Sequence, residues 1–333
     1  MPVSLAEAKN NAQEDLDVAV IDEFRKESAI LDVLTFDDAV NPAGGGATLE
    51  YGYRRLVTQP TAATRALNTE YTPQSVTTQK FSIELAVMGG SFEVDRVIAR
   101  IGPAASSAVS LNMSQKIKAA RTKFQDEVIN GDTAVDANGF DGLDKALSGS
   151  STEFRATSVT DWTDFDTDQR AAFKALDALD EWLSLLDGTP TLVLGNTQAL
   201  ARVRALARRA GMYVRNPVDG LLGPNGRPIV REQYGDIVFV DPGDKAGTSS
   251  PIIPVENRTV GTAQTGLTDL YAVRVGIDGF HGVTTVGSQI VYSWLPDFTS
   301  AGAVKKGEVE LGPVGVALKA TKAASVFRNI KVK

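Results

Sequence analysis

The clearest pattern along the chain is an alternation of apolar and polar residues on both sides of residue 70. On the outward leg the apolar positions are Leu49, Tyr51, Tyr53 and Val57. On the return leg one face carries Thr77, Gln79, Phe81, Ile83, Leu85 and Val87. A period of two is typical of strands with one covered face. We therefore predict a two-stranded arm over residues 47–88, with a bulge or bend at Gly89-Gly90.

The predicted arm outreaches the body of the chain. A return strand over residues 77–89 spans about 40 Å, whereas a compact chain of this length has a radius of gyration of about 20 Å. The tip, residues 58–75, has almost no large aliphatic side chain. Because an isolated hairpin is only marginally stable in water, we expect another molecule to cover the arm. The arm therefore indicates a function in assembly rather than in catalysis.

Helical periodicity appears on both sides of the arm. An apolar stripe followed by Gly131 predicts a helix of about 36 Å over residues 107–130. The stripe consists of Val109, Met113, Ile117, Ala120, Phe124 and Val128. A capping box at Ser4 to Glu7 predicts short helices within the first 35 residues, and Asp95 is predicted to cap a short helix that ends at Gly102.

The remainder mixes helices with strands. A helix is predicted over residues 168–186, and its inward side carries Phe173, Leu176, Leu179, Leu183 and Leu186. A buried strand follows at residues 191–194, and then a helix capped by Asn196, with Leu200, Val203 and Leu206 inward. Residues 211–228 and 243–266 are predicted as loops. Strands are predicted at 237–240, 270–275, 282–285, 290–294, 308–318 and 324–332. This order favours an α+β fold over a doubly wound one.

Composition narrows the possible chemistry. The chain has no cysteine and one histidine, which excludes disulfides, thiolate nucleophiles and multi-histidine metal sites. Its net charge of −7 argues against tight sequence-independent binding of nucleic acid, because that affinity comes from Lys and Arg. No apolar run could span a bilayer, and the start lacks the blocks of a signal peptide, so we expect a cytosolic product without membrane contact.

Individual candidates for chemistry are weak. His281 is most simply a loop or core residue, since no catalytic partner can be assigned to it. The Gly- and Asp-rich segment 136–141 does not fit an EF-hand, because the first and last ligand positions would be Ala134 and Lys145. Four arginines on one helix could bind an anion, but a solvated face or a set of intersubunit ion pairs is the preferred interpretation. They are Arg202, Arg204, Arg208 and Arg209. We expect no cofactor, no metal and no enzymatic activity.

These elements, in this order, resemble the major capsid protein of tailed bacteriophages, the Hong Kong 97-type fold. The resemblance covers nearly the whole chain. It is based on the hairpin at 47–88, the helix at 107–130, the turn Asn138-Gly139-Phe140-Asp141-Gly142-Leu143, the αβ region and the β-rich tail from Gly307 through Phe327. It implies an N-terminal arm (1–46), an extended loop (47–88), a peripheral domain (89–150 and 278–320) with a spine helix, and an apical domain (151–277 and 321–333).

The family implies a shell of pentamers and hexamers around double-stranded DNA, in which the extended loop of each subunit lies across a neighbour. On that loop, the expected intersubunit residues are Tyr51, Arg54, Arg55, Arg65, Glu70, Tyr71 and Lys80. Further expected partners are a separate scaffolding protein, a portal, a possible decoration protein, and packaged DNA on the inner face without sequence-specific binding. Assembly is expected in the host cytoplasm and the product in the virion.

Two features depart from some relatives. The chain has no lysine between Lys26 and Lys80, so a covalent cross-link through a loop lysine is not expected. Because helical structure is expected from the first residues, we do not expect a removable N-terminal scaffolding domain.

Two alternatives stay open. An encapsulin-like nanocompartment shell would use the same fold to enclose enzymes. A two-domain hydrolase with paired carboxylates would need a defined acid/base pair, and none can be named.

Overall fold

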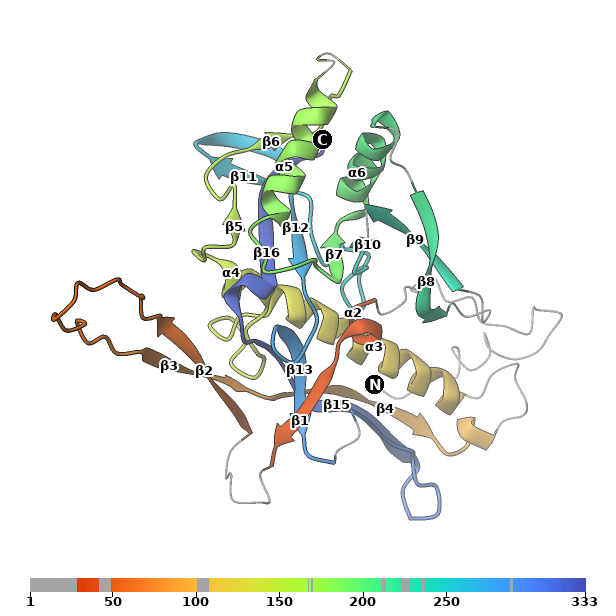
Figure 1. Cartoon of the computed structure of the whole chain (residues 1–333). Helices are drawn as coiled ribbons and strands as arrows, with labels where there is room; N and C mark the ends of the chain where they lie inside the picture. The colour runs from red at the N-terminus through yellow and green to blue at the C-terminus, as the bar shows by residue number, and fades with distance from the viewer. Residues whose placement is uncertain are drawn as a thin grey trace.

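The protein is described by a computed structural model, in which β-strands form three separate sheets (Figure 1). It describes residues 29–41, 49–100, 108–166, 168, 170–210, 214–222, 228–234, 237–287 and 290–333. For residues 214–222 and 228–234 only the backbone is described. The capping box at Ser4 to Glu7, the helices predicted before residue 29 and the helix stop at Gly102 lie outside these ranges.

The first sheet has five strands. Its order is β1 (Phe36–Val40), β13 (Phe280–Thr285), β15 (Val304–Leu318) and β14 (Val291–Trp294), while β4 (Ala86–Asp95) pairs along β15. β1 is parallel to β13, and the other pairs are antiparallel. Strands from the beginning and the end of the chain therefore share one sheet.

The long helix α3 (Ala108–Asn130) packs on β4 and β15 of this sheet (Figure 1). The C-terminal half of its apolar stripe is buried, namely Ala120, Phe124 and Val128. The Phe124 ring lies 6.2 Å from Phe36 and 5.9 Å from Phe140, so it joins the helix to β1 and to the turn after the helix. Ile117 was predicted to be buried but is half-buried, because the core cluster begins one turn later, at Ala120.

The second sheet has nine strands. Its main path is β5 (Glu153–Phe154), β16 (Ala324–Lys331), β12 (Thr262–Val273), β7 (Leu192–Gly195), β10 (Ile237–Val240), β9 (Pro228–Tyr234) and β8 (Val214–Leu222). β11 (Glu256–Val260) pairs with β12, and β6 (Thr160–Asp161) pairs with β16.

Helices α5 (Ala171–Leu183) and α6 (Thr197–Arg209) pack with one face of this sheet, through Val193 and Phe239. The opposite face, through Leu192 and Leu194, belongs to the same core cluster as α3 and α4 (Leu143–Leu147). The shorter helical elements are α2 (Ala29–Val33), η2 (Ile98–Arg100) and η3 (Thr321–Ala323). Among the described residues, no helix is both long enough and apolar enough to span a bilayer.

The α+β class is confirmed, and the elements predicted at 107–130, 191–194, 237–240, 282–285, 290–294 and 324–332 are confirmed within one or two residues. In contrast, α5 is three residues shorter at each end than predicted, and β12 and β15 begin well before the predicted residues 270 and 308. Asn196 does cap α6 by accepting a hydrogen bond from the Gln198 amide. Asp95 accepts one from the Val97 amide before η2. Phe173 was predicted to face inward but is 56% exposed, because Ala172 and Leu176 occupy the inward face of the shorter helix.

Three loop and strand predictions were wrong. The segments predicted as loops at 211–228 and 243–266 contain β8 with the start of β9, and β11 with the start of β12. Pro217 and Gly220 lie within β8, and Gly261 lies in the turn between the paired strands β11 and β12. Gly89 and Gly90 pair regularly with β15, and a Cβ on Gly89 would come within 2.2 Å of the Val309 carbonyl oxygen. The glycine permits a close approach of strands, and the irregularity of this pair lies between Leu311 and Val314.

Candidate functional site: the projecting arm and its root

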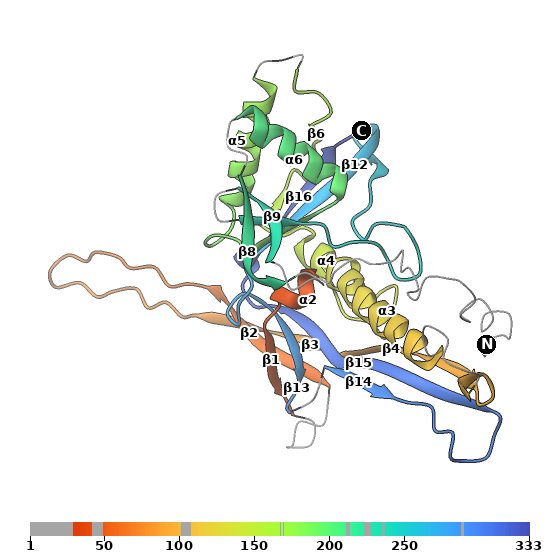
Figure 2. The ribbon, with the colours of Figure 1, turned by 90° about the vertical axis from the view of Figure 1, so that its right-hand side faces the viewer.

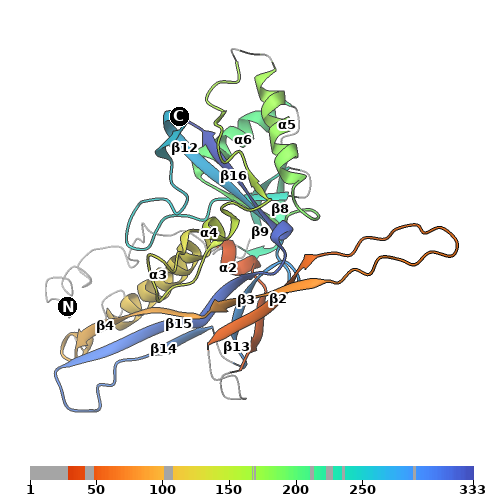
Figure 3. The ribbon, with the colours of Figure 1, turned by 90° about the vertical axis from the view of Figure 1, so that its left-hand side faces the viewer.

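The predicted hairpin forms an arm of two strands, β2 (Glu50–Thr58) and β3 (Thr77–Glu84). Among the described residues no third strand joins this sheet. The arm leaves the body on one side, and its exposed tip, residues 59–76, lies beyond both larger sheets (Figures 1, 2 and 3). The return strand continues past Leu85 into β4, so the arm and the first sheet are parts of one extended run.

The two faces of the arm differ in chemistry. Directly opposite residues of an antiparallel pair share a face. One face carries Tyr53 opposite Phe81, whose rings stack at 5.7 Å, and both are half-buried against the body. The other face carries Arg54 opposite Lys80, and both are exposed. One face therefore attaches the arm to its own subunit, and the other is open.

The attachment is specific. The Tyr53 hydroxyl donates to the Leu318 carbonyl oxygen at 3.0 Å, and Arg55 Nε donates to the Lys319 carbonyl oxygen at 2.9 Å. The Arg55 guanidinium also lies 4.5 Å from the centroid of the Phe81 ring. Burial raises the pKa of Tyr53, so this hydroxyl keeps its proton and its hydrogen bond across the neutral range. Beside these contacts, a cavity of about 330 Å³ separates the root of the arm from α4.

A second cluster at the root centres on Asp37 of β1. Its Oδ2 accepts a hydrogen bond from the Tyr51 hydroxyl at 3.0 Å and lies 3.7 Å from Lys319 Nζ and 3.9 Å from His281 Nε2. His281 is fully buried, and the Tyr51 ring meets its imidazole edge-on at 6.0 Å. Burial, reinforced by Lys319, lowers the pKa of His281, so the imidazole is neutral at pH 7. The cluster joins β1, β2, β13 and the end of β15.

The seven predicted interface residues fall into three groups. Tyr51 and Arg55 bind the arm to its own subunit through the contacts above. Arg54 and Lys80 are on the open face. The other three are exposed at the tip, where Arg65 lies over the Tyr71 ring at 5.6 Å; they are Arg65, Glu70 and Tyr71.

The sequence did not predict the contacts between the root of the arm and the body of the same chain. Tyr53 and Phe81 were visible as apolar positions of the alternation, but their partners Leu318 and Lys319 lie more than 200 residues away along the chain. No local pattern signals such a contact.

Residues of the other two candidate clusters make contacts within the chain. Arg202 donates to the Val332 carbonyl oxygen, and Arg209 pairs with Asp166 at 2.6 Å and lies over the Phe165 ring. In the turn after α3, Asp141 accepts hydrogen bonds from the amide and hydroxyl of Thr133. Within the described part of the chain, no group of three or more His, Cys, Asp or Glu side chains could hold a metal ion.

No protein-family model matches the chain, and the search of curated proteins gave no significant match. Solved structures match over its whole length. An encapsulin from Synechococcus elongatus, solved as a holo-SrpI complex, has a TM-score of 0.59 at 16% identity, covering 100% of this chain and 98% of its own. A structure from Mycobacterium phage Bobi has a TM-score of 0.57 at 12% identity and 99% coverage of both chains.

The capsid of the Myoviridae phage XM1 has a TM-score of 0.56 at 12% identity, covering 95% of this chain and 96% of its own. At such identities the likeness establishes the fold alone. The chain has the Hong Kong 97-type fold of phage capsid and encapsulin subunits, as the resemblance predicted.

Proposed function

We propose that this chain is the major capsid protein of a tailed bacteriophage, a subunit that assembles as pentamers and hexamers into an icosahedral shell around double-stranded DNA. The observation that carries the proposal is the arm within a fold matched from end to end by phage capsid structures. A two-stranded arm with one open face is stable and useful mainly when a neighbouring subunit covers it.

The proposal assigns the sheets to the domains of such a subunit. Residues 89–150 and 278–320, with α3 as the spine helix, would form the peripheral domain, and residues 151–277 and 321–333 the apical domain. The division of strands between the two larger sheets supports this assignment. Residues 47–88 would be the extended loop, and residues 1–46 the N-terminal arm, of which β1 is already part of the first sheet.

The role is structural, so no substrate or cofactor is proposed. Partners would be further copies of the chain, a separate scaffolding protein, a portal, a possible decoration protein and the packaged genome. The net charge of −7 suits a shell that stands beside DNA without binding it tightly.

Expression of the full chain, with electron microscopy of the purified material, tests the proposal. Closed shells of uniform diameter are the expected result. A small oligomer under all assembly conditions would contradict it.

An encapsulin-like shell is the second candidate, favoured by the match to the Synechococcus elongatus encapsulin. Native particles separate the two. A phage capsid has an attached tail and contains DNA, whereas a nanocompartment encloses protein.

A further inference from the structure

Arg55, at the root of the arm, is a half-buried cation that no described carboxylate neutralises. Its Nε donates to the Lys319 carbonyl oxygen at 2.9 Å, and its Nη2 donates to the Leu318 carbonyl oxygen and to the Tyr53 hydroxyl. Its third nitrogen, Nη1, has no hydrogen-bond partner within the described part of the chain. Charged side chains taken out of water are usually paired, because desolvation is unfavourable. The guanidinium is therefore fixed in place and can still bind an anion.

The cavity of about 330 Å³ beside this guanidinium has an apolar lining. The first sheet and α4 supply the buried side chains Phe280, Val316 and Leu143. The arm supplies the stacked, half-buried rings of Tyr53 and Phe81. Sites for small molecules are mostly apolar, contain a few polar groups and have volumes of about 300–1,000 Å³. The cavity lies at the small end of that range, so it suits one compact ligand with a flat apolar body.

The second cation of the lining is Lys145, and its charge is already balanced. Lys145 pairs with Asp141 at 3.0 Å and also with Asp132. Asp141 lines the cavity too, and it accepts hydrogen bonds from the amide and the hydroxyl of Thr133. Arg55 thus gives the cavity a positive charge that its other charged groups do not offset, which favours an anionic ligand.

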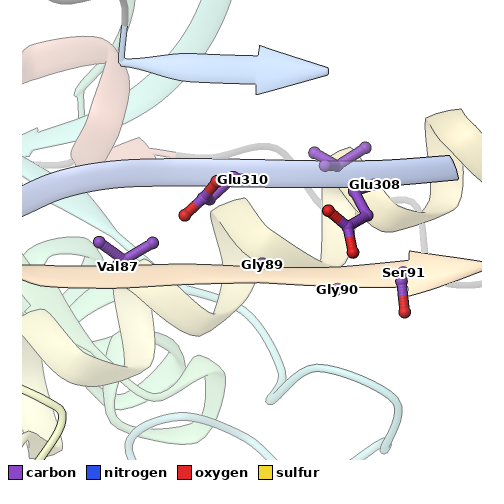
Figure 4. A pocket seen from close by; sticks show the side chains of 7 residues that line it. Val87, Gly89, Gly90, Ser91, Glu308 and Glu310 are labelled. Atoms are coloured by element: carbon purple, nitrogen blue, oxygen red, sulfur yellow. The ribbon is translucent and has the colours of Figure 1, made fainter. Parts of the chain in front are cut away.

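A groove of similar volume between β4 and β15 has the opposite charge (Figure 4). It is lined by Gly89 and Gly90 on one strand and by Glu308 and Glu310 on the other. Lys306 pairs with Glu308 at 2.7 Å, whereas no described cation forms an ion pair with Glu310. The carboxylates would repel an anion, so this groove serves as an internal reference for the cavity at the root.

We propose that the cavity at the root of the arm binds a small amphipathic anion, namely a flat aromatic ring system that carries a carboxylate, sulfonate or phosphate group. The rings would pack against Tyr53 and Phe81, and the anionic group would accept a hydrogen bond from Arg55. Such a ligand contacts the arm, α4 and the first sheet at once. It therefore stabilises the subunit in which the root is attached to the body. The inference goes beyond the proposed shell function and does not depend on it.

A fluorescent probe of this class, 8-anilinonaphthalene-1-sulfonate, tests the site in titrations of the full chain as dissociated subunits. The uncharged N-phenyl-1-naphthylamine has the same rings without the sulfonate. We expect saturable binding of the sulfonate, and Arg55→Gln should weaken it about tenfold, because a hydrogen bond between charged groups is lost. The same substitution should change binding of the uncharged probe less than about twofold. Arg54→Gln, an equal charge change on the open face of the arm, should leave both affinities at the wild-type level.

Filling the cavity tests its location without changing the root contacts. Ala146 of α4 lines the cavity and is exposed, so a larger side chain can be placed there with little cost to folding. Ala146→Phe should weaken binding of both probes about tenfold or more, because its ring occupies the space of the ligand. Ser91→Phe is the matched change at an exposed position of the groove that holds the carboxylates, and it should leave both affinities unchanged.

Hydrogen exchange with and without the sulfonate locates the ligand independently. Peptides that cover residues 79–84 and 143–147 should gain protection, whereas peptides that cover residues 86–95 should not. The inference would be overturned by equal binding to wild type and Ala146→Phe, by equal losses in Arg54→Gln and Arg55→Gln, or by the absence of saturable binding. All measurements are made on dissociated subunits, so these outcomes leave the proposed shell function unaffected.

Discussion

Replacing Phe124 by alanine should remove about 4 kcal/mol from the free energy of unfolding. The side chain is fully buried, and its ring contacts Phe36 of β1 and Phe140 of the turn after α3. Large-to-small changes of buried aromatic residues cost about 3–5 kcal/mol. We place this one above the lower end of that range, because three chain segments would face the cavity and two aromatic contacts would be lost. Whole domains are stable by only about 5–15 kcal/mol.

Phe173→Ala is a matched control, since Phe173 lies on α5 with its side chain 56% exposed. That variant should differ from wild type by less than about 0.5 kcal/mol. The measurement is urea unfolding of dissociated subunits, followed by far-UV circular dichroism. If Phe124→Ala lost no more stability than Phe173→Ala, the helix would not be packed on the sheet by this face.

Three further predictions concern the shell and the root of the arm. Boiled particles should give a single band near 35.4 kDa on a denaturing gel, because the tip of the arm has no lysine to form a cross-link; a ladder of larger bands would contradict this. Replacing residues 56–77 with a short Gly-Ser turn should leave the circular dichroism spectrum close to wild type and abolish closed shells, since the tip is exposed and the root contacts remain; shells of normal size would show that the arm is not a clasp. Burial lowers the pKa of His281, so the folded state resists protonation, and stability should decline as pH falls below the ordinary histidine value of about 6.5. His281→Gln should flatten that decline in urea midpoints measured from pH 7 to 5, and an identical slope in both proteins would refute the assignment.

The sequence predicted what local periodicity encodes. The alternation around Tyr51 and Phe81 revealed the arm, the stripe ending at Val128 revealed α3, and Asn196 marked the start of α6. Each signal lies within one element. The alternation of apolar and polar residues shows which face of a strand is covered, but not which strands it pairs with. It therefore could not show that the return strand leaves one sheet and enters another at Leu85.

Glycine residues were ambiguous, because a glycine can mark a bend or loop and can also permit close pairing of strands. Gly89 was interpreted as a bend, but it permits close approach of β4 to β15. Gly- and Pro-rich stretches hid β8 and β9, since neither residue type favours strands and only pairing with partners stabilises them there.

The sequence predicted which residues belong to the arm, but not which of them contact the body of the same chain. The seven residues were chosen as polar or aromatic side chains on the arm, and the sequence could not separate Arg55, which is turned toward the body, from Arg54, which is turned away. That distinction depends on Leu318 and Lys319, which only the tertiary structure brings near.

The contact between Arg55 and Lys319 spans 264 residues of chain, and β1 likewise pairs with β13 across most of the sequence. Contacts at such separation form late, because the loop between the partners must first be closed. During synthesis the arm is made early, but its orientation is fixed only after the ribosome has released the residues around 319. In the proposed shell, the arm of a subunit would therefore be oriented for contact with a neighbour only after the whole chain has been synthesised and folded.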